Sequence, residues 1–404
     1  MNTNNIILFD DDNWGSLLPL SYTKPAGELR VGILTVREKW EKRLNGSASY
    51  ITQDYLSEKY PIKITSDNIV INSRLMPNDQ IALLVKELDS NEAILYDDVL
   101  LAARLNDNQF QKLINDQDID ELKGIDINNQ KDIISILKRP HDIFKLNAQE
   151  IKLDYDLITK NRYSKAIPEN CRVINESNIF IEEGAEMNFV TLNATDGPIY
   201  IGANTTIMEG ALIRGPFALC DHSTVKMGAK IYSGTTIGPY SKVGGELSNV
   251  VIQAYTNKAH DGFLGNSVIG EWCNIGADTN CSNLKNNYGW VKIWDYTSES
   301  FKISDMQFCG LIMGDHSKAG INTMFNTGTV VGVSANIFGA AFPRTFIPSF
   351  SWGGHAGFQT YNFEKAIEVA EKVMARRNIE LSAQDKTILE HILHSSIHYR
   401  TWQS

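Results

Sequence analysis

A regular repeat that predicts the fold runs through residues 201–243, IGANTTIMEGALIRGPFALCDHSTVKMGAKIYSGTTIGPYSKV. An aliphatic residue recurs in it at every sixth position, and small or turn-forming residues fill much of the space between. Such a fixed period is the signature of an internal structural repeat. The aliphatic residues of the period are Ile201, Ile207, Ile213, Leu219, Val225, Ile231, Ile237 and Val243.

The same period continues beyond this stretch. It slips by two residues between Val243 and Ile269, resumes at Ile269 and Ile275, and returns after a long insertion. The later positions are Met313, Ala319, Phe325, Val331 and Ile337, and an upstream echo is visible at Ile181 and Met187.

A six-residue repeat of this kind predicts a parallel β-helix. Each six-residue side is a short strand and a turn, its aliphatic side chain points into a prism-shaped core, and glycine lets the backbone bend at corners. Three sides make a coil of about 18 residues, so residues 179–341 predict about seven to nine coils. An antiparallel sandwich would alternate with period two and turn every 8–12 residues or so, and it fits the sequence poorly.

Composition divides the chain into two kinds of structure. Of the 29 glycines among the 404 residues, five lie in residues 1–150 and the other 24 lie beyond. A hydrophobic fraction of 43% is enough for a packed core and too high for a disordered chain. The formal net charge of -10 argues against a general nucleic-acid binder, because such proteins need an excess of Lys and Arg.

The sequence indicates a cytoplasmic protein. Its first residues lack the basic region and long apolar region of a signal peptide. No segment approaches the roughly 18–20 apolar residues that span a bilayer, so we expect no membrane partner. The cysteines are odd in number and include no C-x-x-C pair, which favours buried or free thiols over a disulfide framework. They are Cys171, Cys220, Cys273, Cys281 and Cys309.

The phase slip encloses NKAHDGFLGN, residues 257–266, and VIGEWCNIGADTNCSN, residues 268–283, follows it. The hexapeptide coils resemble those of the left-handed β-helix acyltransferases, which implies a left-handed helix and a homotrimer. These two segments resemble the acetyltransferase half of the bifunctional glucosamine-1-phosphate N-acetyltransferase/N-acetylglucosamine-1-phosphate uridyltransferase family. Within that family, the chain most resembles the alternative Bacteroidetes-type branch.

The resemblance assigns roles to residues of this sequence. It implies that His260 is the catalytic base, that Asn274 and Asn283 contact the sugar and its phosphate, and that Ala277 contacts acetyl-CoA, the co-substrate. Lys226 falls where the family has a phosphate-binding Arg, and a lysine supplies a point charge without the bidentate fork.

The chemistry fits a histidine. A sugar amine that attacks a thioester loses a proton, and imidazole accepts a proton near neutral pH. A backbone N–H such as that of Ala277 would stabilise the oxyanion. The alternative is that His260 is a polar corner residue.

Three positions depart from the family's pattern. Lys242 is the nearby candidate for a family lysine without a clear counterpart, Phe263 stands where the family has Tyr, and Leu284 also replaces a Tyr. These changes leave the acceptor sugar open. The insertion from Leu284 to Phe308 either closes over the acceptor or packs on a neighbouring coil.

Residues 1–150 read as an α/β domain. Strands are expected over Asn5 to Phe9, Asn68 to Asn72 and Ala93 to Tyr96, and helices over Val31 to Leu44 and Asp79 to Leu88.

The stretch LLPLSYTKPAGELR, residues 17–30, resembles the start of sugar nucleotidyltransferases, although three aspartates precede it where the family has a glycine-rich loop. Lys24 and Arg30 are the groups expected to meet nucleotide phosphate. Asp97 and Asp98 resemble the family's metal-binding aspartate, which implies Mg²⁺ if this half is active. A degenerate domain that binds sugar nucleotide or serves the assembly is the alternative.

We expect the α/β domain over residues 1–139, a helical connector over 140–167, the β-helix over 168–345 and a helical tail over 346–404. In the tail, His391, His394 and His398 share a helix face, which favours a solvent-facing or subunit-facing surface over a metal site.

Together these features predict an acetyl-CoA-dependent N-acetyltransferase for an amino-sugar phosphate, coupled to a nucleotidyltransferase-like domain in nucleotide-sugar biosynthesis. Two alternatives remain open. In one, only the N-terminal half is an enzyme and the β-helix oligomerises or regulates it; in the other, the chain is a non-catalytic scaffold.

Overall fold

The structure is a computed structural model that describes residues 3–114 and 122–403. The expectation that the first residues are not a signal peptide includes Met1 and Asn2. These two residues lie outside the described ranges. The chain forms two compact units. The first comprises Met1–Leu17, Lys24–Leu29 and Leu34–Lys138, and the second comprises Leu18–Thr23, Arg30–Ile33 and Arg139–Ser404.

The first unit is built on a mixed sheet with strand order β2-β1-β3-β6-β5-β7. The strands are β1 (Asn4–Phe9), β2 (Gly46–Ile51), β3 (Asn68–Asn72), β5 (Glu92–Tyr96), β6 (Val99–Leu105) and β7 (Lys123–Asp126). The helices are α1 (Val36–Leu44), α2 (Asp54–Ser57), α3 (Asp79–Lys86) and α4 (Asp107–Ile114), and a small sheet pairs β4 (Leu75–Met76) with β8 (Ser135–Ile136). The expected α/β class and its three expected strands are confirmed.

Helix α1 begins later than the sequence pattern predicts. Thr35 caps it, because its side chain accepts a hydrogen bond from the backbone N–H of Glu38 while the Glu38 carboxylate accepts one from the Thr35 N–H. The preceding residues bind to the second unit's own helix α5 (Asp142–Thr159): the Gly32 N–H donates to Asn147 Oδ1 over 2.7 Å and the Ile33 N–H to Asp154 Oδ2 over 2.8 Å.

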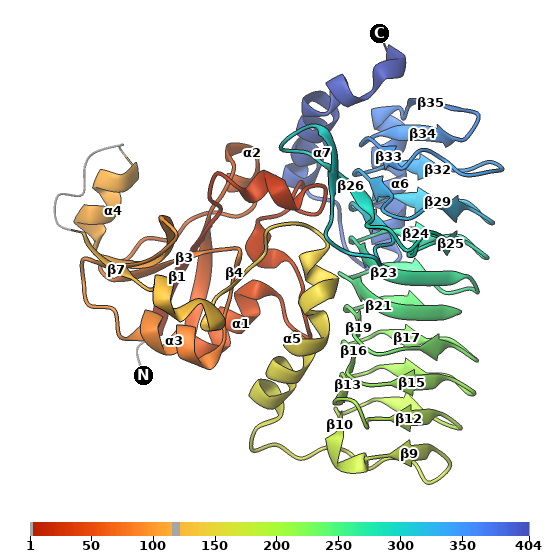
Figure 1. Ribbon diagram of the computed structural model, residues 1–404, viewed down its shortest axis with the longest axis horizontal. Helices are drawn as coiled ribbons and strands as arrows, with labels where there is room; N and C mark the ends of the chain where they lie inside the picture. Colours follow the sequence, from red (N-terminus) through yellow and green to blue (C-terminus); the bar gives the residue numbers. More distant parts are fainter. Residues whose placement is uncertain (1–2, 115–121, 404) are drawn as a thin grey trace. The chain divides into compact units, whose positions relative to one another are not determined.

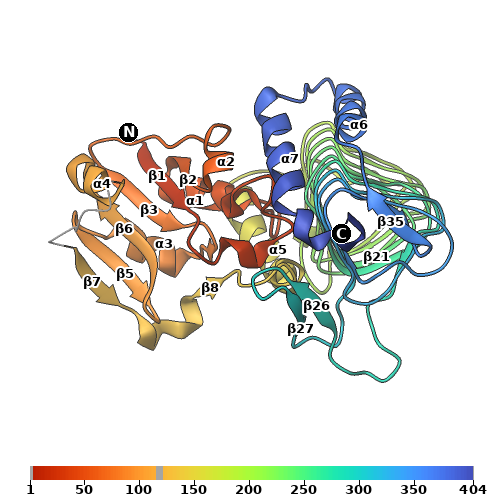
Figure 2. The ribbon, with the colours of Figure 1, turned by 90° about the horizontal axis from the view of Figure 1, so that it is seen from above.

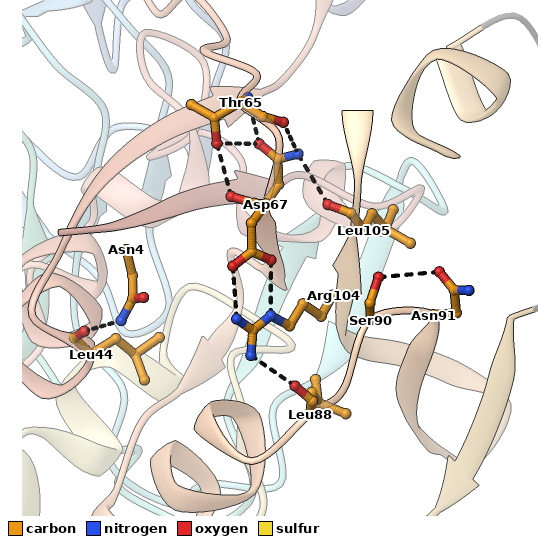
Figure 3. Close-up of polar contacts among 10 residues, drawn as sticks. Asn4, Leu44, Thr65, Asp67, Leu88, Ser90, Asn91, Arg104 and Leu105 are labelled. Atoms are coloured by element: carbon orange, nitrogen blue, oxygen red, sulfur yellow. Dashed lines mark hydrogen bonds and ion pairs between the residues drawn. The ribbon is translucent and has the colours of Figure 1, made fainter. Parts of the chain in front are cut away.

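A forked ion pair closes the amino end of β3 (Figure 3). Arg104 Nε lies 2.9 Å from Asp67 Oδ1, and its Nη2 lies 2.7 Å from Oδ2. Arg104 Nη1 also donates to the carbonyl of Leu88, just after α3. Ser73 and Arg74 follow the opposite, carboxyl end of β3.

The second unit is a left-handed parallel β-helix with a C-terminal helical tail, as predicted (Figure 1). Its coils lie over one another as a nested ring when seen along the axis (Figure 2). The residues of the six-residue period are buried in a single core; Ile201, Val225 and Val243, for example, are 0% exposed.

The coils have three sides. Side one holds β10 (Ile179–Ile181), β13 (Ile199–Ile201), β16 (Phe217–Leu219), β19 (Thr235–Ile237), β28 (Ile312–Met313), β31 (Val330–Val331) and β33 (Phe346–Ile347). Side two holds β11 (Glu186–Met187), β14 (Thr206–Ile207), β17 (Thr224–Val225), β20 (Lys242–Val243), β22 (Asn257–Lys258), β24 (Asn274–Ile275), β29 (Lys318–Ala319), β32 (Asn336–Ile337) and β34 (Ser351–Gly354), with β35 (Gly357–Thr360) antiparallel at its end. Side three holds β9 (Arg172–Ile174), β12 (Thr191–Asn193), β15 (Leu212–Arg214), β18 (Lys230–Ile231), β25 (Asn280–Cys281) and β30 (Met324–Phe325).

Two long strands explain the phase slip. β21 (Glu246–Ile252) and β23 (Phe263–Ile269) run straight from side three into side one, without the corner that other coils have there. These two coils are therefore shorter than the rest, and Val243 of one coil lies beside Lys258 of the next.

The helices of the second unit cover parts of the prism. Helix α5 packs against β19, β21 and β23. The insertion forms a hairpin of β26 (Lys292–Asp295) and β27 (Ser300–Ile303), in which Trp294 stacks on Phe346 of β33 with ring centroids 4.1 Å apart. The hairpin thus packs on a neighbouring coil, one of the two placements expected. The tail helices are α6 (Phe363–Ala375) and α7 (Ala383–Ser395).

Candidate functional site

The corner between sides two and three, which we call the His260 corner, is built differently from its neighbours. Usually a residue with left-handed backbone conformation, such as Gly228 or Asp278, turns the chain there. The Asp278 N–H donates over 3.0 Å to the carbonyl of Asp261, which aligns Asp278 with Gly262 of the preceding coil. Between Lys258 and Gly262 the chain has one residue more than between Ile275 and Asp278. His260 lies in this enlarged turn and is exposed.

Ala277 lies at the same corner in the next coil. Its carbonyl accepts a hydrogen bond from the Asn322 N–H over 2.8 Å. Within residues 3–114 and 122–403, its own N–H has no hydrogen-bond acceptor. Parallel strands of neighbouring coils lie about 4.8 Å apart. An exposed imidazole and a free backbone N–H therefore occupy successive layers of one corner.

Side two places the expected Lys242 and Asn274 in one column. Lys242 is paired with Asn257, and Asn257 with Asn274, so both site residues stand in the outward-facing register of this side. Asn257 Nδ2 donates to Asn274 Oδ1 over 2.9 Å. Each strand of side two leads into the His260 corner, so Lys242 and Asn274 both lie shortly before that corner in the chain.

Side three places Phe263 and Asn283 beyond the corner. The Phe263 N–H donates to Asn280 Oδ1 over 2.8 Å, and Asn283 Nδ2 donates to Asn266 Oδ1 over 2.8 Å. A Cβ at Gly265 would lie 2.6 Å from both the Phe263 ring and Asn283 Nδ2, so glycine there lets these side chains meet. The site residues expected from the sequence thus flank the His260 corner on its two sides.

Cationic side chains lie near Lys242 and the His260 corner. Lys226 belongs to the His260 corner, and a Cβ at Gly244, one coil on, would lie 3.2 Å from Lys226 Cβ. Burial lowers the pKa of Lys242, and the positive charges of Arg377, Lys226 and Arg376 lower it further. In the part of the chain that the structure describes, none of these four cations has a carboxylate partner. Arg376 and Arg377 were not expected from the sequence.

Lys258 was also missed. It occupies a core position of side two, between Val243 and Ile275, and is 1% exposed. Its Nζ donates to the carbonyl oxygens of His260 over 2.7 Å and of Asp261 over 3.3 Å. Burial lowers its pKa to about 8, although the charges of Asp261 and Asp278 oppose this. The break in the aliphatic period at this position was the signal available in the sequence.

The first unit has a pocket of about 270 Å³ at the carboxyl end of its strands. Such ends form the ligand-binding edge of open α/β sheets. Its lining combines two cations with amide, hydroxyl, aromatic and carboxylate groups: Asn13, Ser16, Arg74, Tyr96, Asp97, Val99, Ile136 and Lys138. Arg74, which follows β3, and Lys138 were not among the expected residues.

The aspartates after β1 serve the protein itself. Asp10 accepts hydrogen bonds from Thr52 and from the Ala26 N–H, and burial raises its pKa. Asp11 pairs with Arg74. Burial would raise the pKa of Asp11, but hydrogen bonds from Arg74 and Asn72 outweigh this and lower it.

Lys24 and Arg30, expected to bind nucleotide, are not among the described residues that line the pocket, whereas one of the two aspartates expected to bind metal is. Asp97 lines it, and Asp98 is exposed in the same turn. Lys24 is buried in the first unit, but Arg30 belongs to the second. There the Arg30 N–H donates to Gln253 Oε1 over 2.6 Å, and its guanidinium binds backbone carbonyls. These hydrogen bonds indicate that Arg30 stabilises the second unit.

Metal ligands are sparse. Across residues 3–114 and 122–403, no group of three or more His, Cys, Asp or Glu residues is arranged to hold a metal ion. Asp97 and Asp98 therefore do not make a complete Mg²⁺ site with protein groups. In the tail, His398 Nε2 lies 3.1 Å from Glu299 Oε1, so it binds a carboxylate of the insertion. The described helices include none that is long and apolar enough to cross a membrane.

Comparison with known proteins finds similarity to transferases. The family model described as sugar nucleotidyl transferase matches residues 6–163. Bifunctional protein GlmU of Methanocaldococcus jannaschii is 31% identical over 214 residues, which cover 53% of this chain and 45% of that protein. The uncharacterized acetyltransferase YaiX of Escherichia coli O6:K15:H31 is 26% identical over 162 residues, 40% of this chain and 70% of that protein.

Among solved structures, LpxA, a UDP-N-acetylglucosamine acyltransferase from Bacteroides fragilis, aligns with 56% of this chain and 96% of its own. Its sequence identity to this chain is 16%, and the TM-score is 0.24. The chain spans about half the length of the GlmU proteins that it matches. Residues 6–163 are thus similar to sugar nucleotidyl transferases, and the chain is similar in part to the bifunctional transferase GlmU.

Proposed function

We propose that the β-helix catalyses transfer of an acetyl group from acetyl-CoA to the amine of an amino-sugar phosphate similar to glucosamine 1-phosphate. The observation that carries this proposal is the His260 corner, where an exposed imidazole and the free Ala277 N–H occupy successive layers. The similarity to GlmU and YaiX supports it independently.

The chemistry assigns one task to each group. The amine nitrogen attacks the thioester carbonyl carbon, and His260 takes up the proton that the nitrogen loses. The Ala277 N–H donates a hydrogen bond to the oxyanion of the tetrahedral intermediate. Collapse of that intermediate forms the amide and releases the CoA thiolate, which can regain the proton from the imidazolium.

The cations and amides around the corner suit the acceptor. Lys226 and Lys242 supply positive charge for a phosphate, and Arg376 and Arg377 add to it. Asn274 and Asn283, with Phe263 beside Asn283, offer amide groups and an apolar surface on which a sugar ring can rest.

A homotrimer would complete such a site. Met227 and Ile321 occupy the same corner position as Ala277 in other coils and are each 69% exposed. Two largely exposed apolar side chains beside a polar site favour burial against a neighbouring copy of the chain. Native mass spectrometry tests this part of the proposal: a trimer supports it, and a monomer at micromolar concentration contradicts it.

The acceptor is tested with a panel. Release of the CoA thiol is followed with glucosamine 1-phosphate, glucosamine 6-phosphate and glucosamine as acceptors. We expect the 1-phosphate to be preferred over glucosamine by about tenfold or more, because a phosphate bound by several cations contributes at least 1.4 kcal/mol. Turnover with none of the three contradicts the proposal.

A second function has its own support. The pocket of the first unit and the match of residues 6–163 favour transfer of a nucleotidyl group to a sugar 1-phosphate, in which Arg74 and Lys138 would meet phosphate oxygens. The sequence leaves a degenerate, substrate-binding domain as the alternative. Pyrophosphate release from UTP and N-acetylglucosamine 1-phosphate with Mg²⁺ separates the two: turnover shows the enzyme, and nucleotide binding without turnover shows the degenerate domain.

A further inference from the structure

Among the described residues, the core of the β-helix contains a lysine, Lys258, where the repeat otherwise places an aliphatic residue. Along side two, the inward-facing positions are held by Ile207, Val225 and Val243, then by Lys258, and then by Ile275. A buried ammonium carries a large desolvation penalty unless hydrogen bonds satisfy it. The neighbouring aliphatic residues show that a methylene-only side chain would fit this column, so the lysine needs a reason beyond packing.

The enlarged turn supplies that reason. The extra residue at the His260 corner places the carbonyl oxygens of His260 and Asp261 within reach of the Lys258 Nζ, at 2.7 and 3.3 Å. The Asp261 carbonyl also accepts from the Asp278 N–H. Among the described residues, Lys258 is the hydrogen-bond donor to the His260 carbonyl. The Lys258 ammonium therefore binds, from the core side, the backbone of the turn that carries the His260 imidazole.

We propose that Lys258 is a positioning residue that fixes the backbone of the His260 turn from inside the core, and thereby holds the imidazole in place for acetyl transfer. The inference rests on the proposed function of His260. Lys258 touches neither substrate, since its side chain is enclosed by the core. Its effect passes through the two carbonyl groups that it binds.

The charges that face Lys258 agree with this task. Asp261 lies in the turn itself and Asp278 lies at the same corner of the next coil, and both favour the charged form of the lysine. The other side-chain neighbours in the column, Val243 and Ile275, carry no charge. The ammonium therefore has its partners on the side of the turn.

The test uses Lys258→Leu in the full chain, because leucine restores the aliphatic repeat and lets the β-helix stay folded. Hydrogen–deuterium exchange of peptides covering residues 258–265 is compared with kcat and with KM for acetyl-CoA. We expect exchange at residues 259–262 to become faster by about tenfold, and kcat to fall by about 10- to 100-fold, as for a displaced catalytic group, while KM changes less than about twofold. Ile207→Met, a substitution in the same column at a distant coil, is the matched control and should change none of these.

Each outcome decides the question. Unchanged exchange and unchanged kcat in a folded Lys258→Leu variant overturn the proposal, and so do equal losses in Ile207→Met. If Lys258→Leu does not fold, Lys258→Met replaces it, and a failure of both variants to fold also overturns the proposal, since it makes Lys258 a stability residue. If the wild-type chain shows no acetyl transfer, the function proposed for His260 fails, and the exchange comparison alone decides whether Lys258 fixes the turn.

Discussion

The guanidinium of Arg74 holds the carboxylate of Asp11 in a forked ion pair, with Arg74 Nε 2.9 Å from Asp11 Oδ1. Asp11 follows β1 and Arg74 follows β3, so the pair joins two neighbouring strands at their carboxyl ends. The Arg74 side chain is 5% exposed and also lines the pocket of the first unit. One residue therefore supports the pocket and forms part of its wall.

Removing one partner of this pair should be costly. We expect Arg74→Met to lower the free energy of unfolding of the first unit by about 3 kcal/mol, because it leaves the Asp11 carboxylate without its cation in a largely buried place. Chemical denaturation followed by tryptophan fluorescence measures the loss. The double variant Asp11→Leu/Arg74→Met is the control and should recover part of the stability, since it removes both charges. A double variant that is as unstable as Arg74→Met argues against the ion pair as the cause.

The tail depends on a stack of rings along the corner between sides one and two. Trp272 stacks on Tyr255 with centroids 4.1 Å apart and is covered by Ala370, Met374 and Leu381 of the tail. We expect Trp272→Ala to weaken this docking by about 3 kcal/mol, the usual loss for a buried large side chain. Because each coil contacts mainly its neighbours, the prism itself should persist.

Limited proteolysis shows the difference. Cleavage should begin within residues 355–383 in Trp272→Ala, and the β-helix should remain as a protected fragment. His222→Ala removes an exposed ring at the far end of the same stack and serves as the control. Equal resistance of the wild type and Trp272→Ala would show that the tail is held in another way.

Stability should respond to pH through Lys258. Its pKa is about 8 in the folded chain, against the usual 10.5. Between these values the unfolded chain binds more protons than the folded chain, so this group makes stability rise with pH over that window. Relative to Lys258→Leu, the wild type should gain up to about 1.4 kcal/mol per pH unit between pH 8 and 10. Urea unfolding of both proteins at pH 8 and pH 9.5 measures this difference, and a constant difference contradicts the lowered pKa of Lys258.

The sequence predicts the regular coils of the β-helix well but predicts the two shortened coils and the core lysine poorly. Ile201 and the other residues of the period each repeat one local environment, so the pattern alone reveals the core. The corner lost in β21 and β23 saves residues in two coils, which the sequence shows only as a slip in phase. Lys258 breaks the aliphatic period, but the sequence alone does not place it in the core, because that placement follows from the shortened coils.

The first unit shows what sequence patterns miss. Arg74 could have been suspected, since it follows a buried strand at the edge where ligands bind. Lys138 lies at the pocket through tertiary packing that no spacing reveals. Arg30 stands near Lys24 in the sequence, but its backbone binds Gln253 and it belongs to the other unit.

The proposed acetyl transfer depends on the His260 imidazole as its base. Its most direct test is kcat/KM of His260→Asn with acetyl-CoA and glucosamine 1-phosphate, next to His355→Ala, which removes another exposed histidine of the β-helix. We predict that His260→Asn loses about 10²–10⁴-fold, the usual contribution of a general base, while His355→Ala stays at the wild-type value. If His260→Asn acetylates at the wild-type rate, His260 is not the base of the reaction.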